Sequence, residues 1–185
     1  IFNNMTLLLN ILNNIWFSTY SLYIYSFIDN SQIETYKTLL CISGIYYFIY
    51  DSVLEIYLHK RLVYIPHHMF SLVGFYMIQN VIIPYDLLRI YILLLGLLES
   101  TSLMVNVRII LKNNKRLSIT LDKYFLLYYT LIRCVIYPYY LYYYFENQLL
   151  LTCSWSIYLM SLYWTIKWSK NIYKVTHSMK LDKPI

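Results

Sequence analysis

Long apolar runs alternate with short polar connections along the whole chain. Each run has about 20 residues, the length that crosses a hydrocarbon core when the rise per residue is about 1.5 Å. The runs are Thr6–Ile28, Lys37–Leu58, Val63–Ile83, Leu87–Leu111, Lys123–Tyr144 and Leu149–Lys167. The pattern predicts an all-α fold, a polytopic transmembrane helix bundle of about six spans.

The charges between the runs predict the orientation of this bundle. Basic residues gather in every second connection, with Lys60 and Arg61 in the second, Lys112, Lys115 and Arg116 in the fourth, and further lysines after the last run. Because cytosolic loops carry the excess of Lys and Arg, we expect both termini to be cytosolic.

The same pattern predicts how the chain is divided. We expect an N-terminal span in residues 1–35, one transmembrane domain in residues 36–176 and a cytosolic tail in residues 177–185. The first residue is Ile rather than Met, so the completeness of the first span stays open.

Composition supports a membrane protein and argues against other classes. The chain is 59% hydrophobic and only 13% charged, unlike a soluble domain of 185 residues. The net charge of +6 lies between the apolar runs, where orientation and anionic headgroups explain it better than nucleic acid does. The three cysteines are scattered, without the spacing of metal ligands or a disulfide framework.

Ionisable side chains within the runs are the candidates for a functional site. His67 and His68 follow Pro66 at the start of the third run, and Asp51 lies near the end of the second. Such groups are costly in hydrocarbon unless they face the interior of a bundle. An imidazole can serve as base or nucleophile near neutral pH, and a carboxylate can fix its tautomer. Adjacent histidines on a helix point about 100° apart, which disfavours a shared metal ion.

A second polar group lies at comparable depth in the later runs. Glu99, Ser102 and Asn106 are spaced i, i+3, i+7 and should share one helix face, with Arg108 near its end and Arg133 in the fifth run. The stripe should face the bundle interior, because exposure to lipid is unfavourable. Arg108 or Arg133 could hold a phosphate or thioester oxygen.

Several segments together resemble the TLC-domain family, which includes translocation-associated membrane proteins, ceramide synthases and a neuronal ceroid lipofuscinosis protein. The matching stretches are Tyr46–Asp51, Ile65-Pro-His-His68, Leu98-Glu-Ser-Thr101 with Asn106-Val-Arg108, Arg133 with Pro138, and Leu162–Ile166. Ceramide synthases add two aspartates before the glutamate, where this chain has Ile92 and Leu95. The resemblance is therefore to the branch outside the ceramide synthases.

This resemblance implies a role in lipid metabolism or homeostasis at the endoplasmic reticulum or a related endomembrane. It implies acyl transfer to a membrane lipid, with acyl-CoA as co-substrate and no tightly bound cofactor. His67 or His68 would be base or nucleophile, and Asp51, or failing that Glu99, would orient it. Expected partners are membrane lipids and not nucleic acid; a second copy of the chain or a cargo protein stays open.

Each candidate residue also has a structural interpretation, and His67 and His68 could be an interfacial pair that hydrogen-bonds lipid headgroups and caps a helix. Asp51 could form a buried ion pair with Arg108 or Arg133. Glu99, Asn106, Arg108 and Arg133 could simply join helices by hydrogen bonds. The alternative function is a non-catalytic membrane protein that binds a lipid or a cargo protein in the same cavity.

Overall fold

The computed structural model describes residues 2–54, 56, 65–80, 83–114, 116–144 and 148–181, and this part of the chain is all-α without strands. The helices are α1 (Phe2–Phe27), α2 (Ile33–Leu54), α3 (Ile65–Asn80), α4 (Tyr85–Asn113), α5 (Ile119–Thr130), the π-helical turn η3 (Leu131–Ile136), α6 (Tyr137–Tyr144) and α7 (Gln148–Leu181). Since α5, η3 and α6 form one continuous helical segment, six helical segments correspond to the six apolar runs. The predicted all-α fold is confirmed.

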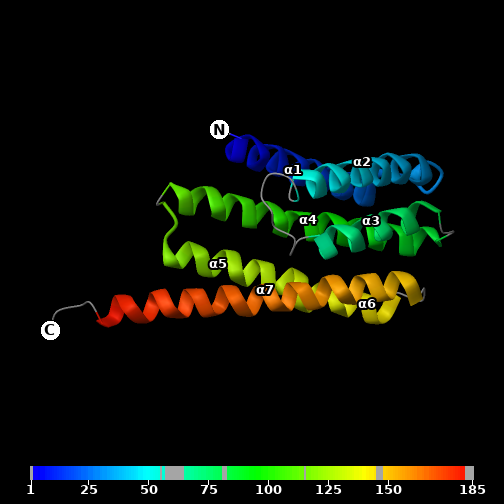
Figure 1. The fold of residues 1–185 in the computed structure, drawn as a ribbon. Helices are drawn as coiled ribbons and strands as arrows, with labels where there is room; N and C mark the ends of the chain where they lie inside the picture. The colour runs from blue at the N-terminus through cyan, green and yellow to red at the C-terminus, as the bar shows by residue number, and fades with distance from the viewer. Residues whose placement is uncertain are drawn as a thin grey trace.

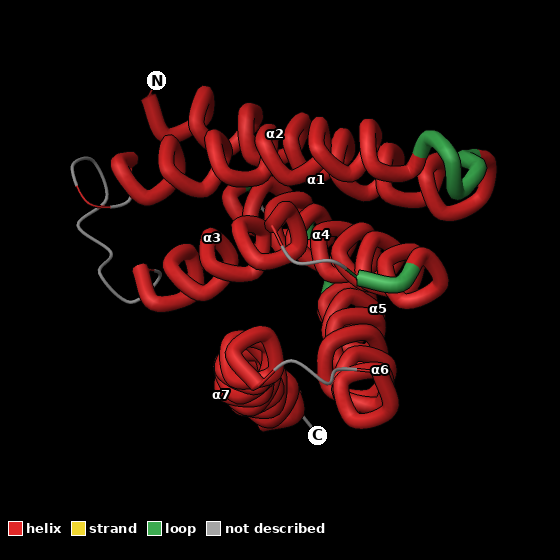
Figure 2. The backbone as a smooth tube through the Cα atoms, turned by 90° about the vertical axis from the view of Figure 1, so that its right-hand side faces the viewer, coloured by secondary structure: helices red, strands yellow, loops and turns green. Residues whose placement is uncertain are grey.

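The six segments are stacked in three layers of two. Helices α1 and α2 form one outer layer, α3 and α4 the middle, and α7 with the α5–α6 segment the other outer layer (Figures 1 and 2). Successive segments run in alternating directions, so that α1 begins and α7 ends at the same end of the bundle (Figure 1). The middle layer therefore has neighbours on both sides, and a polar interior can form along it.

Only one helix in the described part of the chain is both long and apolar enough to be identified as a membrane span on those two criteria. This helix is α4, whose most apolar stretch has a mean hydropathy of 1.7. Of the others, α3, α5 and α6 have only 16, 12 and 8 residues, and α1, α2 and α7 carry many tyrosines, asparagines and serines, which lower their hydropathy. Six helices are thus observed, whereas six membrane spans remain a prediction.

Small residues set the distance between neighbouring helices. A Cβ atom added to Gly96 of α4 would lie 2.7 Å from Cβ of Ser21 on α1, and one added to Gly44 of α2 would lie 2.6 Å from the ring of Phe75 on α3. Gly96 therefore lets α1 and α4 approach closely, and Gly44 leaves room for the ring of Phe75 between α2 and α3.

Arg89, near the start of α4, caps the C-terminal end of α1. Its guanidinium donates to the backbone carbonyls of Tyr25, at 3.0 Å, and Ile28, and to the Asn30 side chain at 3.1 Å. The last carbonyls of a helix have no partner within the helix and carry partial negative charge. Arg89 satisfies them and fixes the register of α1 against α4.

Candidate functional site

A cavity of about 610 Å³ lies between the layers and collects the residues that the sequence singled out. Helices α1, α2, α3, α4, α5 and α7 and the turn η3 all contribute to its wall. It follows α4 from Glu99 to Asn113, about 20 Å at the helical rise. The wall includes every predicted site residue: Asp51, His67, His68, Glu99, Asn106, Arg108 and Arg133.

His68 is held between two residues of α2. Its Nε2 lies 3.3 Å from Oδ2 of Asp51, and its Nδ1 lies 3.1 Å from Oγ of Ser52. Asp51 also accepts a hydrogen bond from the amide of Asn10 on α1, at 3.4 Å. Asp51 and His68 are both buried. This cluster joins α1, α2 and α3, and it uses both ring nitrogens of His68.

The order Ser52, His68, Asp51 has the composition of a serine-hydrolase triad, but its geometry does not favour one. The Ser52 hydroxyl donates to the carbonyl of Phe48 one turn earlier, at 2.6 Å, and Ser52 does not line the cavity. A nucleophile must reach the substrate and give its proton to the base. Ser52 instead steadies the ring of His68.

His67 contrasts with its neighbour. It lines the cavity, and its ring meets Phe48 edge-on, with ring centroids 6.2 Å apart. The rings of His67 and His68 are 5.8 Å apart and inclined by 57°. No described residue hydrogen-bonds to the ring nitrogens of His67. Of the two histidines, His67 is therefore the one whose nitrogens are open to a ligand.

Arg133 enters the cavity from a widened helical turn. In η3 the N–H of Tyr137 donates to the carbonyl of Ile132, five residues back, instead of four. Pro138 follows at once; its ring has no N–H and would clash with the carbonyl four residues earlier. The wider turn relieves this conflict, and such turns frequently occur at functional sites.

The guanidinium of Arg133 is buried among neutral acceptors. It donates to Thr101 at 2.5 Å and to Ser102 and the Leu98 carbonyl at 3.0 Å each, with a longer contact of 3.5 Å to Ser161. Within the described part of the chain no carboxylate forms an ion pair with it. Its positive charge is therefore available to an anionic ligand in the cavity.

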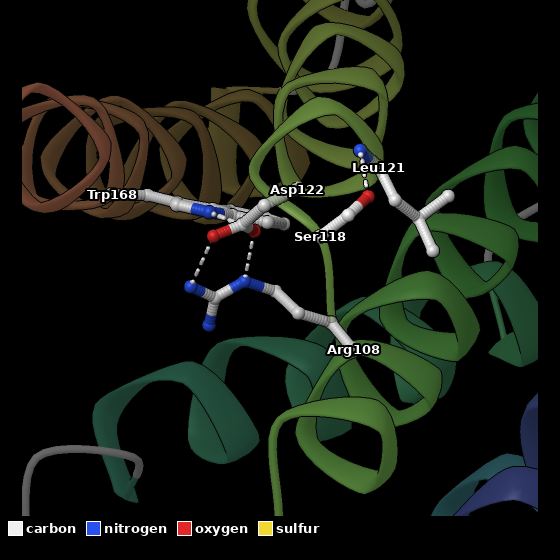
Figure 3. A network of polar contacts seen from close by, with 5 residues as sticks. All are labelled: Arg108, Ser118, Leu121, Asp122 and Trp168. Carbon is white, nitrogen blue, oxygen red and sulfur yellow. Dashed lines mark hydrogen bonds and ion pairs between the residues drawn. The ribbon is translucent and has the colours of Figure 1, made fainter. Parts of the chain in front are cut away.

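Arg108, by contrast, is already paired. It donates through Nε to Oδ1 of Asp122 at 2.5 Å and through Nη2 to Oδ2 at 3.0 Å (Figure 3). Asp122 also accepts from Nε1 of Trp168 at 2.8 Å, and the guanidinium lies 4.4 Å from the centre of the Trp168 ring. The cluster joins α4, α5 and α7.

Two sequence-based alternatives are therefore wrong. Asp51 forms its ion pair with His68, not with Arg108 or Arg133. Arg108 is also unsuited to hold a phosphate or thioester oxygen, because Asp122 already occupies it in a bidentate geometry. Asp122 lies between the fourth and fifth apolar runs, and its distance from Arg108 along the sequence gives no sign of the pair.

Glu99 and Asn106 complete the polar wall on α4. Glu99 is buried, and no described residue hydrogen-bonds to its carboxyl; it does not pair with either histidine. Asn106 is half-buried. Both line the cavity together with Ser102, so the stripe faces the bundle interior as its spacing predicts.

No family model, curated protein or solved structure matches this chain. The resemblance to the TLC-domain family remains a prediction from short motifs.

Several cavity residues were not among the sequence-based site predictions. Asn10 and Asn14 of α1 line the cavity, as do Lys112 of α4 and Lys167 of α7. A signal existed for the two asparagines, since they are spaced i, i+4 in an apolar run and must share a face. Lys112 was interpreted as an orientation signal and Lys167 ends the last apolar run, so only the fold brings the two lysines to one cavity. Glu55, His59, Lys60 and Arg61 lie outside the described residues.

Proposed function

We propose that this chain is a multi-pass endomembrane protein of lipid metabolism that transfers an acyl group from acyl-CoA to a membrane lipid. His67 is the base. The proposal follows the resemblance of the sequence to the TLC-domain family, in the branch outside the ceramide synthases.

The outer surface supports a lipid environment. Large apolar side chains point outward from several helices, including Leu12 on α1, Tyr46 on α2, Leu127 on α5 and Leu159 on α7, with exposed fractions of 54%, 72%, 65% and 61%. These side chains come from both outer layers of the bundle, whereas large exposed apolar surfaces are uncommon on soluble monomers. A hydrocarbon layer around the bundle would cover it.

One observation carries the proposed reaction. His67, Glu99 and Arg133 also line a second, smaller pocket of about 80 Å³, whose other wall residues are mostly apolar, such as Phe70, Phe75 and Leu95. These three polar residues thus lie where a polar cavity meets an apolar pocket. The reacting end of an acyl thioester suits this division, with the first carbons of its chain on the apolar side and its polar head on the other.

The residues at this junction have suitable chemistry. A neutral His67 nitrogen takes the proton from the hydroxyl or amine of the lipid acceptor, whose oxygen or nitrogen then bonds to the thioester carbonyl carbon. Arg133 stabilises the negative charge on the carbonyl oxygen. The carbon–sulfur bond breaks, and the thiolate of CoA takes up the proton from His67.

Two lysines in the cavity wall are suited to bind the CoA part of the acyl donor. Lys112 and Lys167 line the cavity, and neither pairs with a carboxylate of a described residue. Lys167 lies 5.0 Å from the ring centre of Trp164. The phosphate groups of CoA would bind to these cations near the end of α4, about 20 Å along the helix from Glu99.

The test uses the full chain in lipid nanodiscs with radiolabelled oleoyl-CoA and an endomembrane lipid extract. Replacement His67→Ala should lower product formation by about 10²- to 10⁴-fold, the usual contribution of a general base. His177→Ala, on the exposed part of α7, is the matched control and should keep full activity. Equal activity of His67→Ala and wild type would refute the role of His67. If wild type forms no product yet retains lipid, the non-catalytic binding function is supported instead.

A further inference from the structure

Helix α1 places a fully buried amide in the cavity wall. Asn14 is only 1% exposed, and neither its Nδ2 nor its Oδ1 has a hydrogen-bond partner among the described residues. It lines the same cavity as His67 and Glu99. One turn earlier, Oδ1 of Asn10 is also without a partner, while its Nδ2 donates to Asp51.

An amide in this position is unfavourable for folding alone. A buried polar group without a hydrogen bond costs free energy, and the large majority of buried side-chain polar atoms have a partner. A leucine of similar size would carry no such penalty. Asn14 has two groups without a partner, an NH2 group that donates and a carbonyl oxygen that accepts, and the cavity is the space in which a ligand can bind both.

The position of Asn14 is fixed by its neighbours, so the amide cannot turn away easily. Phe17, on the next turn of α1, is 1% exposed, and its ring packs against Phe75 and Tyr47, with centroids 5.8 Å and 6.3 Å away. Further along, the contact of Ser21 with Gly96 holds α1 tightly to α4. The amide is therefore held ready for a ligand.

We propose that Asn14 is a specificity-determining residue that binds a neutral hydroxyl or amide group of a lipid in the cavity. The hydrogen-bonding groups of the Asn14 amide indicate this class of ligand. A phosphate or carboxylate only accepts hydrogen bonds and an ammonium group only donates them, whereas a hydroxyl or amide does both and can satisfy both atoms of Asn14. The inference rests on the proposed function and names the acceptor lipid as a neutral one with a free hydroxyl or amide.

The experiment compares two lipids with the same acyl chain. Wild-type protein in nanodiscs is loaded with a pyrene-labelled fatty-acid methyl ester, and 1-oleoylglycerol or methyl oleate is added as competitor. Two neutral hydrogen bonds should make 1-oleoylglycerol about five- to tenfold more effective. In Asn14→Leu the ratio should fall to about one. In the matched control Asn13→Leu the ratio should be unchanged, because Asn13, whose Nδ2 is also buried without a partner, is half-buried and does not line the cavity.

Folding is checked by the melting temperature of each variant in the same nanodiscs. If Asn14→Leu does not fold, Asn14→Ala removes the amide without adding volume and takes its place. The inference is overturned if wild type binds both lipids equally, if the amide-free variant keeps the preference, or if Asn13→Leu loses it. The readout is binding, so it is independent of turnover: a His67→Ala result that refutes acyl transfer would leave this preference in place.

Discussion

Removing either member of the Arg108–Asp122 pair should destabilise the bundle strongly, whereas removing both should not. The pair is bidentate and only 19% and 14% exposed, and Trp168 covers it. Breaking a buried pair leaves one charge without compensation and costs about 3–5 kcal/mol. Since both side chains retain some exposure, we expect about 3 kcal/mol for Arg108→Leu and for Asp122→Leu.

The double variant removes both charges together. It still loses the hydrogen bond from Trp168 to Asp122, which contributes about 1 kcal/mol. We therefore expect a total loss of about 1–2 kcal/mol, well below the sum of about 6 kcal/mol from the two single variants. Apolar residues can replace a buried ion pair at little cost.

Equilibrium unfolding in mixed dodecyl maltoside and SDS micelles, followed by tryptophan fluorescence, measures these free energies. The pair between Lys37 and Glu34 provides the internal control, because its atoms are equally close, at 2.5 Å, but Glu34 is 52% exposed. Lys37 is itself only 7% exposed, but Glu34→Gln keeps a carbonyl oxygen that can accept from it, so the loss should be about 1–2 kcal/mol, smaller than that of either single variant at the buried pair. If the two single losses at Arg108 and Asp122 add within about 0.5 kcal/mol in the double variant, the two side chains do not form the buried pair that the structure shows.

Three further predictions concern how the helices and the site are held. Arg89→Met should lower the unfolding free energy by about 1–2 kcal/mol, because the end carbonyls of α1 lose their donor; proteolysis near residues 28–32 should show the loosened end. Gly96→Val should cost about 1–3 kcal/mol through overpacking against Ser21, in the same micelle assay, and no loss would contradict the close approach of α1 and α4. Ser52→Ala should leave acyl-transfer turnover within about twofold while His67→Ala abolishes it; a collapse of turnover would instead make Ser52 a nucleophile.

The sequence predicted the helices well because their signal is local. Runs of apolar residues of span length correspond to six observed helical segments, and the i, i+3, i+7 spacing of Glu99, Ser102 and Asn106 identified the face of α4 that lines the cavity. Periodicity within one helix is contained in the sequence itself. All seven residues that the sequence singled out line the cavity, since ionisable groups are rare in such runs.

The spacing of residues within one helix did not predict which side chains pair with each other between helices. Asp122 was assigned to a connection, yet the approach of α4, α5 and α7 makes it the partner of Arg108 and leaves Arg133 as the buried cation without a carboxylate among the described residues. The two histidines are indistinguishable in sequence. Tertiary packing placed Asp51 and Ser52 against His68 and left His67 open.

The sequence by itself therefore determined which segments are helical and which polar side chains share the helix face toward the interior, because both follow from the spacing of residues along one helix. The tertiary structure decided which of those side chains neutralise one another and which remain for a ligand. That choice depends on distances of about 3 Å between helices far apart in the chain, and the rotation and depth of each helix set those distances.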